Sequence, residues 1–294
     1  MIKKAIIPVA GLGTRFLPLS KVMPKELWPL VDKPVIQYIL EELRASGISE
    51  IIFVISSEKK VILDYFKKSP KIEKVLRERK KGELLRAFQD FQDFCQDFSI
   101  SYVFQKKPLG DGHAFLQAAK LIKKEPCVGL FADDVVESKV PCALQLSKIF
   151  KTCQKPVVAL HRVGEEKIPY YGIAKVEKIA SRLYKIKEIV EKPSVEEAPS
   201  NLAIVGKYVL TPEVFSYLKE AKSSEGKVGM KSGEIILGEV LNKMLKDGKV
   251  IYGYEFDGKW LECGNKLDWL KSHLYLSLKD PQFGQGLKEF LKET

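Results

Sequence analysis

The hydrophobic positions of the N-terminal half follow two spacings in turn. Short, continuously apolar runs, typical of strands covered on both faces, occur at Lys4–Val9 and Ile51–Ile55. Between them, Pro34–Ser46 carries apolar residues at helical spacing, and Gly47 suits the position just past a helix C-terminus. The same order continues and predicts helices at Lys60–Phe66, across Pro70–Phe98 and at Ala114–Ile122, with strands at Tyr102–Phe104 and Val128–Phe131.

This alternation predicts a Rossmann-like α/β fold, with a mostly parallel central sheet flanked by helices. Crossover connections between parallel strands are right-handed, and ligands of such sheets gather at the carboxyl ends of the strands. Functional residues are therefore expected directly after strands.

The pattern changes after Pro156. Val157–Leu160 is a further strand, and two alternating stretches around Ala174–Val176 and Leu183–Val190 predict an antiparallel hairpin. The remaining elements expected are a strand at Ala203–Leu210, helices near Thr211–Ala221 and Gly233–Lys246, a strand at Val250–Phe256, a terminal helix from Leu267, and a mobile loop at Ser223–Gly233. We predict a single domain over residues 1–294, divided into about 1–155, about 156–266 and a C-terminal helical region, 267–294.

Composition fits one large core, since 45% of the 294 residues are hydrophobic. The formal charge of +11 is compatible with anionic substrates, nucleic acid or a membrane surface. Basic residues are spread over the whole length, however, and the densest cluster, at residues 77–81, contains Glu78 and has no aromatic platform. A solvated helical face explains this cluster better than a nucleic-acid site, so no nucleic-acid partner is expected.

The five cysteines are scattered, with no two closer than eleven positions, which predicts neither a disulfide framework nor a Cys-x-x-Cys metal site. The apolar run before Gly11 is too short for a signal peptide, and no run approaches the length of a membrane span. These features favour a cytoplasmic protein with no membrane partner.

The first strand leads into Gly11-Leu12-Gly13-Thr14-Arg15, and Lys25 follows within Pro24-Lys25-Glu26. Two glycines let the backbone approach a polyphosphate, while the arginine and the lysine add positive charge. A glycine pair after a strand is, by itself, more often a plain turn. The dinucleotide fingerprint is not present, because Phe16 stands where its third glycine would be. The Walker A motif, Gly-x-x-x-x-Gly-Lys-Ser/Thr, is absent too.

Three segments of the opening resemble bacterial UTP:glucose-1-phosphate uridylyltransferases, which belong to the sugar nucleotidylyltransferases. These segments are Ile7–Arg15, Pro24–Glu26 and Pro29–Pro34, and further matches continue to about Leu267. The resemblance implies Mg²⁺-assisted transfer of the uridylyl group of UTP to glucose 1-phosphate, giving UDP-glucose and pyrophosphate. It also implies that residues 1–155 bind the nucleotide and 156–266 the sugar, and that the chain forms a homo-oligomer, a dimer or a tetramer.

The same resemblance assigns the nucleotide contacts. Arg15 and Lys25 would contact the phosphates, and Gln105 and Gly110, in a stretch reading Gln-Lys-Lys-Pro-Leu-Gly-Asp-Gly-His-Ala, would read the base. A glutamine amide offers both donor and acceptor to the imide edge of uracil. His113 is expected to start or cap the next helix and is given no acid–base role. The loop residues that would wrap the triphosphate are Ala10, Gly11, Gly13 and Thr14.

The candidates for metal ligands are carboxylates. Asp133 and Asp134 follow an apolar strand, and two adjacent acids favour a hard divalent cation, with a turn or helix-cap aspartate about equally compatible. The resemblance favours Asp133 as the Mg²⁺ ligand. It suggests Glu262 as the second ligand, in Glu262-Cys263-Gly264-Asn265, although the family usually has aspartate there.

Glu191-Lys192-Pro193 resembles the family's sugar-phosphate motif, in which a carboxylate can accept sugar hydroxyls and an ammonium group can meet a phosphate. Taken alone, such a tripeptide is more often a surface turn. The resemblance adds Gly172, which would let the hexose approach the backbone, and Lys207 near the sugar phosphate. Arg15, Lys25 and Lys192 would carry catalysis by neutralising charge.

The stretch around Glu234 departs from the family, which leaves the sugar preference and assembly open. Two alternatives follow from the sequence: a related enzyme that uses dTTP, CTP or another hexose phosphate, and a non-catalytic sugar-nucleotide sensor.

Overall fold

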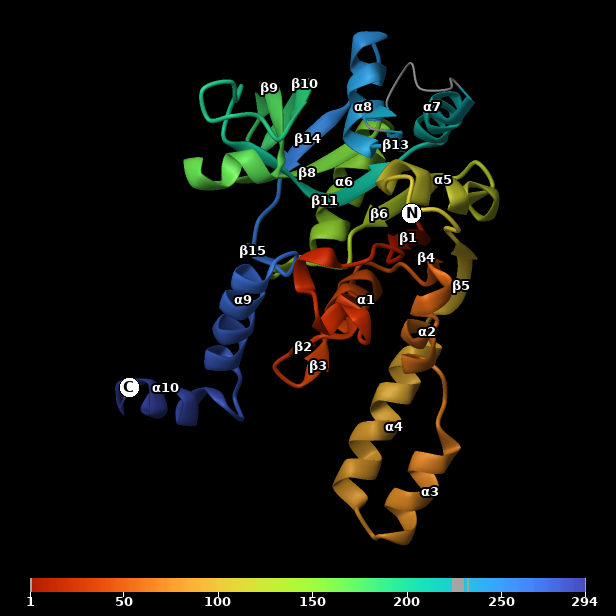
Figure 1. Ribbon diagram of the computed structural model, residues 1–294, viewed down its shortest axis with the longest axis vertical. Coiled ribbons are helices and arrows are strands. Elements are labelled where there is room, and N and C mark those ends of the chain that lie inside the picture. The colour runs from red at the N-terminus through yellow and green to blue at the C-terminus, as the bar shows by residue number, and fades with distance from the viewer. Residues whose placement is uncertain (1, 224–229, 232, 294) are drawn as a thin grey trace.

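A nine-stranded sheet lies at the centre of the computed structural model, with helices on both faces (Figure 1). The structure describes residues 2–223, 230–231 and 233–293. Most of Ser223–Gly233, the expected mobile loop, lies outside these residues.

The sheet has the order β5-β4-β1-β6-β11-β8-β14-β10-β9. Neighbouring strands are parallel from β5 to β6 and between β8 and β14, while β11 and β10 run antiparallel to their neighbours. Seven of the nine strands therefore point the same way, as predicted. The bounds are β1 Lys4–Pro8, β4 Glu50–Ile55, β5 Ser99–Phe104, β6 Cys127–Leu130, β8 Val157–Arg162, β9 Gly172–Ala180, β10 Leu183–Glu191, β11 Leu202–Leu210 and β14 Tyr252–Glu255.

Each face of the sheet has its own apolar core. On one face, α1 (Val35–Ala45) and α6 (Cys142–Cys153) bury side chains such as Leu40 and Leu146. The other face packs α5 (Asp111–Ile122), α7 (Pro212–Ser223) and α8 (Leu237–Lys246) around Phe115 and Leu241. Strands from both sides of residue 155 share this sheet, and the division into a nucleotide part and a sugar part stays a prediction.

Three helices differ from their predicted extent. Pro70–Phe98 is two helices, α3 (Pro70–Glu78) and α4 (Gly82–Gln96), because Lys80 has a positive φ of 54°. These two helices pack on each other and project from the body of the molecule (Figure 1).

The helix predicted from Gly233 begins only at Leu237, because Glu234–Ile235 forms β13 and pairs with β12 (Met230–Lys231). The terminal helix is also divided, into α9 (Lys266–Lys279) and α10 (Gly284–Glu293). Asp280 is extended there, as expected for a residue that precedes a proline.

A small ribbon extends the sheet beyond the carboxyl end of β6. Strand β7 (Asp134–Glu137) pairs antiparallel with β15 (Lys259–Glu262), and the register places Glu262 opposite Asp134. The ribbon therefore brings the late segment near Glu262 to the same end of the sheet as the first strand.

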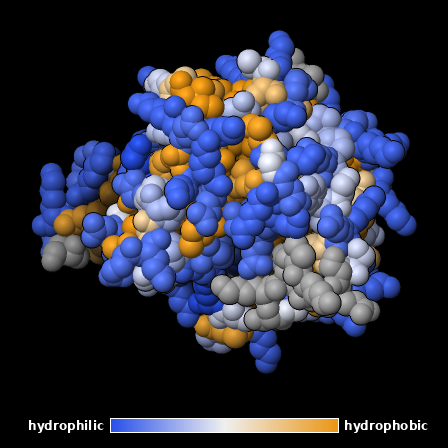
Figure 2. All heavy atoms as spheres, turned by 90° about the horizontal axis from the view of Figure 1, so that it is seen from above, coloured by the Kyte–Doolittle hydropathy of each residue, from blue (hydrophilic) through white to orange (hydrophobic). Residues whose placement is uncertain are grey.

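Figure 2 shows one face covered mostly by hydrophilic residues, with hydrophobic atoms in separate patches. Among the described helices, none combines the length and the apolar character that a membrane span requires.

Candidate active site

Two cavities adjoin at the carboxyl ends of the parallel strands. The larger cavity, of about 310 Å³, is bounded by β9, β10, β11 and β15, and the smaller cavity, of about 280 Å³, by the loops that follow β1, β5 and β6. Four residues line both cavities: Lys25, Asp111, Phe131 and Asp133. A molecule in one cavity would therefore meet a molecule in the other beside Lys25 and Asp133.

The glycine loop after β1 folds back on itself. Gly13 adopts a left-handed conformation, with φ 66°, and its carbonyl oxygen accepts a hydrogen bond of 2.8 Å from the Ser20 hydroxyl. Ala10 and Gly11 line the smaller cavity, whereas Gly13 and Thr14 line neither. The loop therefore reaches the cavity through Ala10 and Gly11, and the nucleotide contacts of all four loop residues stay a prediction.

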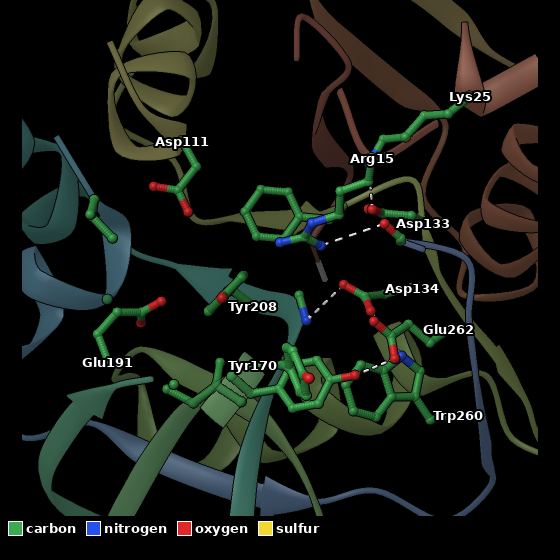
Figure 3. A pocket seen from close by; sticks show the side chains of 18 residues that line it. Arg15, Lys25, Asp111, Asp133, Asp134, Tyr170, Glu191, Tyr208, Trp260 and Glu262 are labelled. Atoms are coloured by element: carbon green, nitrogen blue, oxygen red, sulfur yellow. Dashed lines mark hydrogen bonds and ion pairs between the residues drawn. The ribbon is translucent and has the colours of Figure 1, made fainter. Parts of the chain in front are cut away.

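Arg15 and Lys25 reach the larger cavity from two short helical turns, Thr14–Phe16 and Lys25–Leu27. The Arg15 guanidinium lies 3.5 Å from the carbonyl oxygen of Gly264, and the Lys25 ammonium pairs with Asp133 (Figure 3). Burial opposes the charge on Lys25, but the carboxylates of Asp133 and Glu26 outweigh this effect and raise the pKa of Lys25. The site therefore presents two cations to a phosphate.

A second ion pair supports the Lys25 loop from below. Both oxygens of Glu26 accept hydrogen bonds from the Lys59 ammonium, at 3.0 and 2.9 Å, and both side chains are buried. Burial lowers the pKa of Lys59. Because Glu26 lies beside Lys25 in the sequence, this pair holds the chain that carries the catalytic candidate.

Asp133 and Asp134 have different surroundings although they are neighbours. Burial favours the neutral form of Asp133, but the cations of Lys25 and Arg15 reverse this effect, and the pKa of Asp133 lies below its usual range. For Asp134, burial and the charge of Asp133 raise the pKa to about 7. Asp133 is thus the carboxylate that stays charged beside the two cations.

Asp134 instead joins two distant strands. Its Oδ2 accepts a hydrogen bond of 3.1 Å from the backbone N–H of Gly206, and its Oδ1 accepts one of 2.8 Å from the Trp260 indole. Asp134 therefore connects β7 with β11 and β15 at the floor of the larger cavity.

Glu262 enters the larger cavity from β15. Its Oε2 accepts a hydrogen bond from the Tyr171 hydroxyl and lies 3.5 Å from the Lys167 ammonium. A Cβ built on Gly264 would lie 3.1 Å from Asp133 Oδ2 and 3.5 Å from Glu262 Oε1. The bare backbone of Gly264 thus leaves a small space that both carboxylates approach.

These two carboxylates fit a magnesium ion. Mg²⁺ prefers hard oxygen donors, and in sites that handle phosphates it is held by one or two carboxylates together with substrate phosphates and water. Within residues 2–223, 230–231 and 233–293, no group of three or more metal-binding side chains is present. A magnesium ion here would therefore complete its ligand set with the substrates.

The sugar-side carboxylate, Glu191, projects into the larger cavity from the end of β10 (Figure 3). It pairs in register with Gly172, the first residue of β9, where a Cβ would lie only 3.0 Å from Glu191 Oε2. Gly172 therefore leaves the room that the Glu191 carboxylate occupies. Both residues line the cavity, and their contact with the sugar stays a prediction.

Lys192 and Lys207 do not line either cavity. Lys192 is exposed, and its backbone, with φ 49°, donates a hydrogen bond of 3.0 Å to the Tyr171 carbonyl oxygen. Its contact with the sugar phosphate stays a prediction.

Lys207 lies on the opposite side of the sheet from the cavity, fully buried, with its ammonium 2.8 Å from Glu42 Oε2 of α1. The reason is strand alternation: Ile204, Gly206 and Tyr208 line the cavity, so Lys207 between them points the other way. The prediction that Lys207 lies near the sugar phosphate is therefore wrong in this structure.

The base candidates Gln105 and Gly110 both line the smaller cavity. Gln105 directly follows β5, and its amide nitrogen donates a hydrogen bond of 2.9 Å to the carbonyl oxygen of Gly110. Gly110 has φ 93°, and a Cβ there would collide with the carbonyl oxygen of Ile235. Only glycine fits at this position.

Several cavity residues escaped sequence reasoning. Asp111 is the most informative, since it lies opposite Lys25 and its Oδ1 accepts hydrogen bonds from the backbone N–H groups of Gly112 and Leu237, at 2.6 and 2.9 Å. It thereby joins the beginnings of α5 and α8. An acid between two glycines after a strand was the available signal. The other missed residues include Phe131, Tyr170, Tyr208 and Trp260.

Comparisons with known proteins agree over nearly the full length. A profile of the nucleotidyl transferase family matches residues 4–277. A UTP–glucose-1-phosphate uridylyltransferase of Staphylococcus haemolyticus is 43% identical over 292 residues, which are 99% of this chain and 98% of that protein. A protein of the same name from Staphylococcus epidermidis is 41% identical, with the same coverage.

Solved structures give the same result. The UTP-bound UGPase of Acinetobacter baumannii has a TM-score of 0.88 at 34% identity, covering 100% of this chain and 99% of that one. A UDP-glucose pyrophosphorylase complexed with UDP-glucose has a TM-score of 0.83 at 36% identity, covering 95% and 100%. The chain therefore belongs to the nucleotidyl transferase family, in the group of UTP–glucose-1-phosphate uridylyltransferases.

Proposed function

We propose that the protein transfers the uridylyl group of UTP to glucose 1-phosphate, giving UDP-glucose and pyrophosphate. The observation that carries this proposal is the meeting of two cavities at a charged junction, where Lys25 and Asp133 line both. UTP would occupy the smaller cavity and glucose 1-phosphate the larger one. The names of the relatives and the ligands of the two solved structures support this choice.

The reaction needs no protein base. An oxygen of the sugar phosphate, already ionised near neutral pH, forms a new bond to the α-phosphorus of UTP, and the bond from that phosphorus to the bridging oxygen of the β-phosphate breaks. The electron pair leaves with pyrophosphate. The main barrier is the repulsion between two anions, so Arg15 and Lys25 act by neutralising charge and by positioning.

Magnesium would be held by Asp133 and Glu262. When bound, it neutralises phosphate charge and polarises the phosphoryl group under attack. Glu191 would accept hydrogen bonds from sugar hydroxyls, beside the open backbone of Gly172. Lys192 is proposed to meet the sugar phosphate from its exposed position next to Glu191.

Pyrophosphate release tests the proposal directly. With Mg²⁺ and glucose 1-phosphate we expect release from UTP, far less from CTP, and none after chelation of the metal. Parallel reactions with other hexose 1-phosphates test the sugar. Turnover of dTTP or CTP in preference to UTP would show that the substrate is wrongly assigned. Tight binding of UDP-glucose without pyrophosphate exchange would point to a sensor.

Three expectations about the wider context remain predictions of the sequence. These are a cytoplasmic location, assembly as a homo-oligomer, and the absence of nucleic-acid and membrane partners.

A further inference from the structure

The Gln105 amide is held by two acceptors. Its nitrogen lies 2.9 Å from the carbonyl oxygen of Gly110 and 3.2 Å from Nδ1 of His113. A carbonyl oxygen can only accept a hydrogen bond, so the end of the amide that faces Gly110 must be the NH₂ group. Both hydrogens of that group are then used within the protein.

This arrangement also determines which ring nitrogen of His113 carries the proton. Because an amide nitrogen only donates, Nδ1 of His113 must accept, and the ring is neutral with its proton on Nε2. The amide nitrogen of Gln117 lies 2.9 Å from Nε2 and 3.4 Å from the His113 carbonyl oxygen. A neutral ring cannot accept at both nitrogens, and the bond from Gln105 to Gly110, at 2.9 Å, is the shorter of the two amide–carbonyl contacts. The Gln117 amide therefore turns its oxygen to the Nε2 proton and gives up the longer contact. Burial lowers the pKa of His113, which keeps the imidazole neutral.

One atom of the Gln105 amide is left for a ligand. Its oxygen has no hydrogen-bond partner among the described residues. The fully buried side-chain atoms that lack a partner belong to Trp28 and Thr211, so the Gln105 oxygen is not one of them and remains accessible. Because Gln105 lines the smaller cavity, this oxygen is an open acceptor there. It requires a donor from the base. Uracil offers N3–H at its imide edge, whereas N3 of cytosine carries no hydrogen and would face the oxygen as a second acceptor.

We propose that His113 is the positioning residue that sets the base preference, by holding the Gln105 amide with its oxygen toward the base. The inference rests on the proposed function, and it assigns a role in substrate selection to a buried histidine that does not touch the reacting phosphates. Without the Nδ1 acceptor, the Gly110 carbonyl alone holds the amide, so rotation that offers the NH₂ group to cytosine breaks one hydrogen bond instead of two.

The test compares three forms of the full-length protein: wild type, His113→Ala and His113→Asn. Asparagine can place its amide oxygen near the position of Nδ1 and so restore the acceptor. The measurement is kcat/KM for UTP, CTP and 5-methyl-UTP with glucose 1-phosphate and Mg²⁺. 5-methyl-UTP is the internal control, because it keeps the imide edge of uracil.

We expect the UTP-over-CTP ratio to fall about tenfold or more in His113→Ala, as for the loss of one specific hydrogen bond. The ratio of UTP to 5-methyl-UTP stays constant, and His113→Asn retains most of the UTP-over-CTP preference. Equal losses on all three nucleotides would show that His113 only supports the fold and would overturn the proposal.

A second measurement needs no variant and no turnover. The ¹⁵N chemical shifts of His113 in the wild-type protein report which ring nitrogen carries the proton. We expect protonated Nε2 and unprotonated Nδ1, and a proton on Nδ1 would overturn the proposal. If wild type bound UTP over CTP but released no pyrophosphate, the proposed function would fail while this inference would stand.

Discussion

The two cavities are built from different parts of their strands. The smaller cavity is formed by residues that come just after a strand, as Gln105 follows β5 and Ala10 follows β1. The larger cavity also uses side chains that project from within a strand, such as Ile204 and Tyr208 of β11. The end of a strand can be located from a hydrophobic pattern alone. Which residues within a strand meet a ligand depends on the side of the sheet that the ligand occupies, because successive side chains point to opposite faces.

Asp133 and Asp134 give the sharpest form of this comparison, because one follows a strand end and the other belongs to a ribbon. Asp133→Asn is expected to lower kcat by about a thousandfold, since it removes the charged partner of Lys25 and the proposed metal ligand. Pyrophosphate release under saturating substrates measures the effect, and circular dichroism checks the fold.

Asp134→Asn is the matched control. Its carboxyl group binds Gly206 and Trp260 rather than the cations, so we expect a lower melting temperature and a smaller loss of kcat. If both variants lost the same activity, the distinction between a catalytic strand end and a structural ribbon would be wrong.

Two lysines compare a residue of the cavity wall with a residue that supports it from the core. Lys25→Gln is expected to reduce kcat by about a hundredfold, because Lys25 lines both cavities. Its effect on the free energy of unfolding should be smaller than that of Lys59→Gln, because its ion pair with Asp133 is more exposed. Lys59→Gln breaks the buried pair with Glu26 and should lower the free energy of unfolding by about 3 kcal/mol. Urea denaturation and initial rates separate the two effects. An unstable Lys25→Gln protein would contradict this assignment.

Replacement of Glu262 tests whether the sugar side of the site supplies a ligand to the metal. Glu262→Ala should raise the Mg²⁺ concentration for half-maximal activity about tenfold, while excess Mg²⁺ restores much of the rate. Glu166→Ala is the control, because Glu166 lines neither of the two cavities. An unchanged Mg²⁺ requirement in Glu262→Ala would leave Asp133 as the protein ligand.

Sequence reasoning succeeded where a motif and a strand end coincide. The parallel strands could be placed because they are apolar runs whose ends are visible in the sequence. The same ends locate the glycine loop, Gln105 and Asp133, which follow these runs. The hairpin of β9 and β10 was also predicted, and its register brings Gly172 to Glu191.

The rest depended on contacts between distant segments. Asp111 joins the beginnings of α5 and α8 only when folding brings the backbone N–H of Leu237, 126 positions later, to its carboxylate. The start of α8 was missed for a related reason, since the pairing of β13 overrode the apparent helical pattern. The sequence alone shows neither contact, because each is made by tertiary folding.

Lys207 shows how strand alternation limits inference from a motif, and its replacement should have the smallest effect on turnover. Lys207→Met removes a fully buried cation and leaves Glu42 unpaired, so the free energy of unfolding should fall by about 3 kcal/mol. The KM for glucose 1-phosphate should change by less than about twofold, because the side chain points away from the cavity. Adding Glu42→Leu should recover part of the stability, since an unpaired buried charge is then absent, although the backbone N–H of Ala143 loses its acceptor. A large rise in KM at unchanged stability would instead return Lys207 to the sugar phosphate.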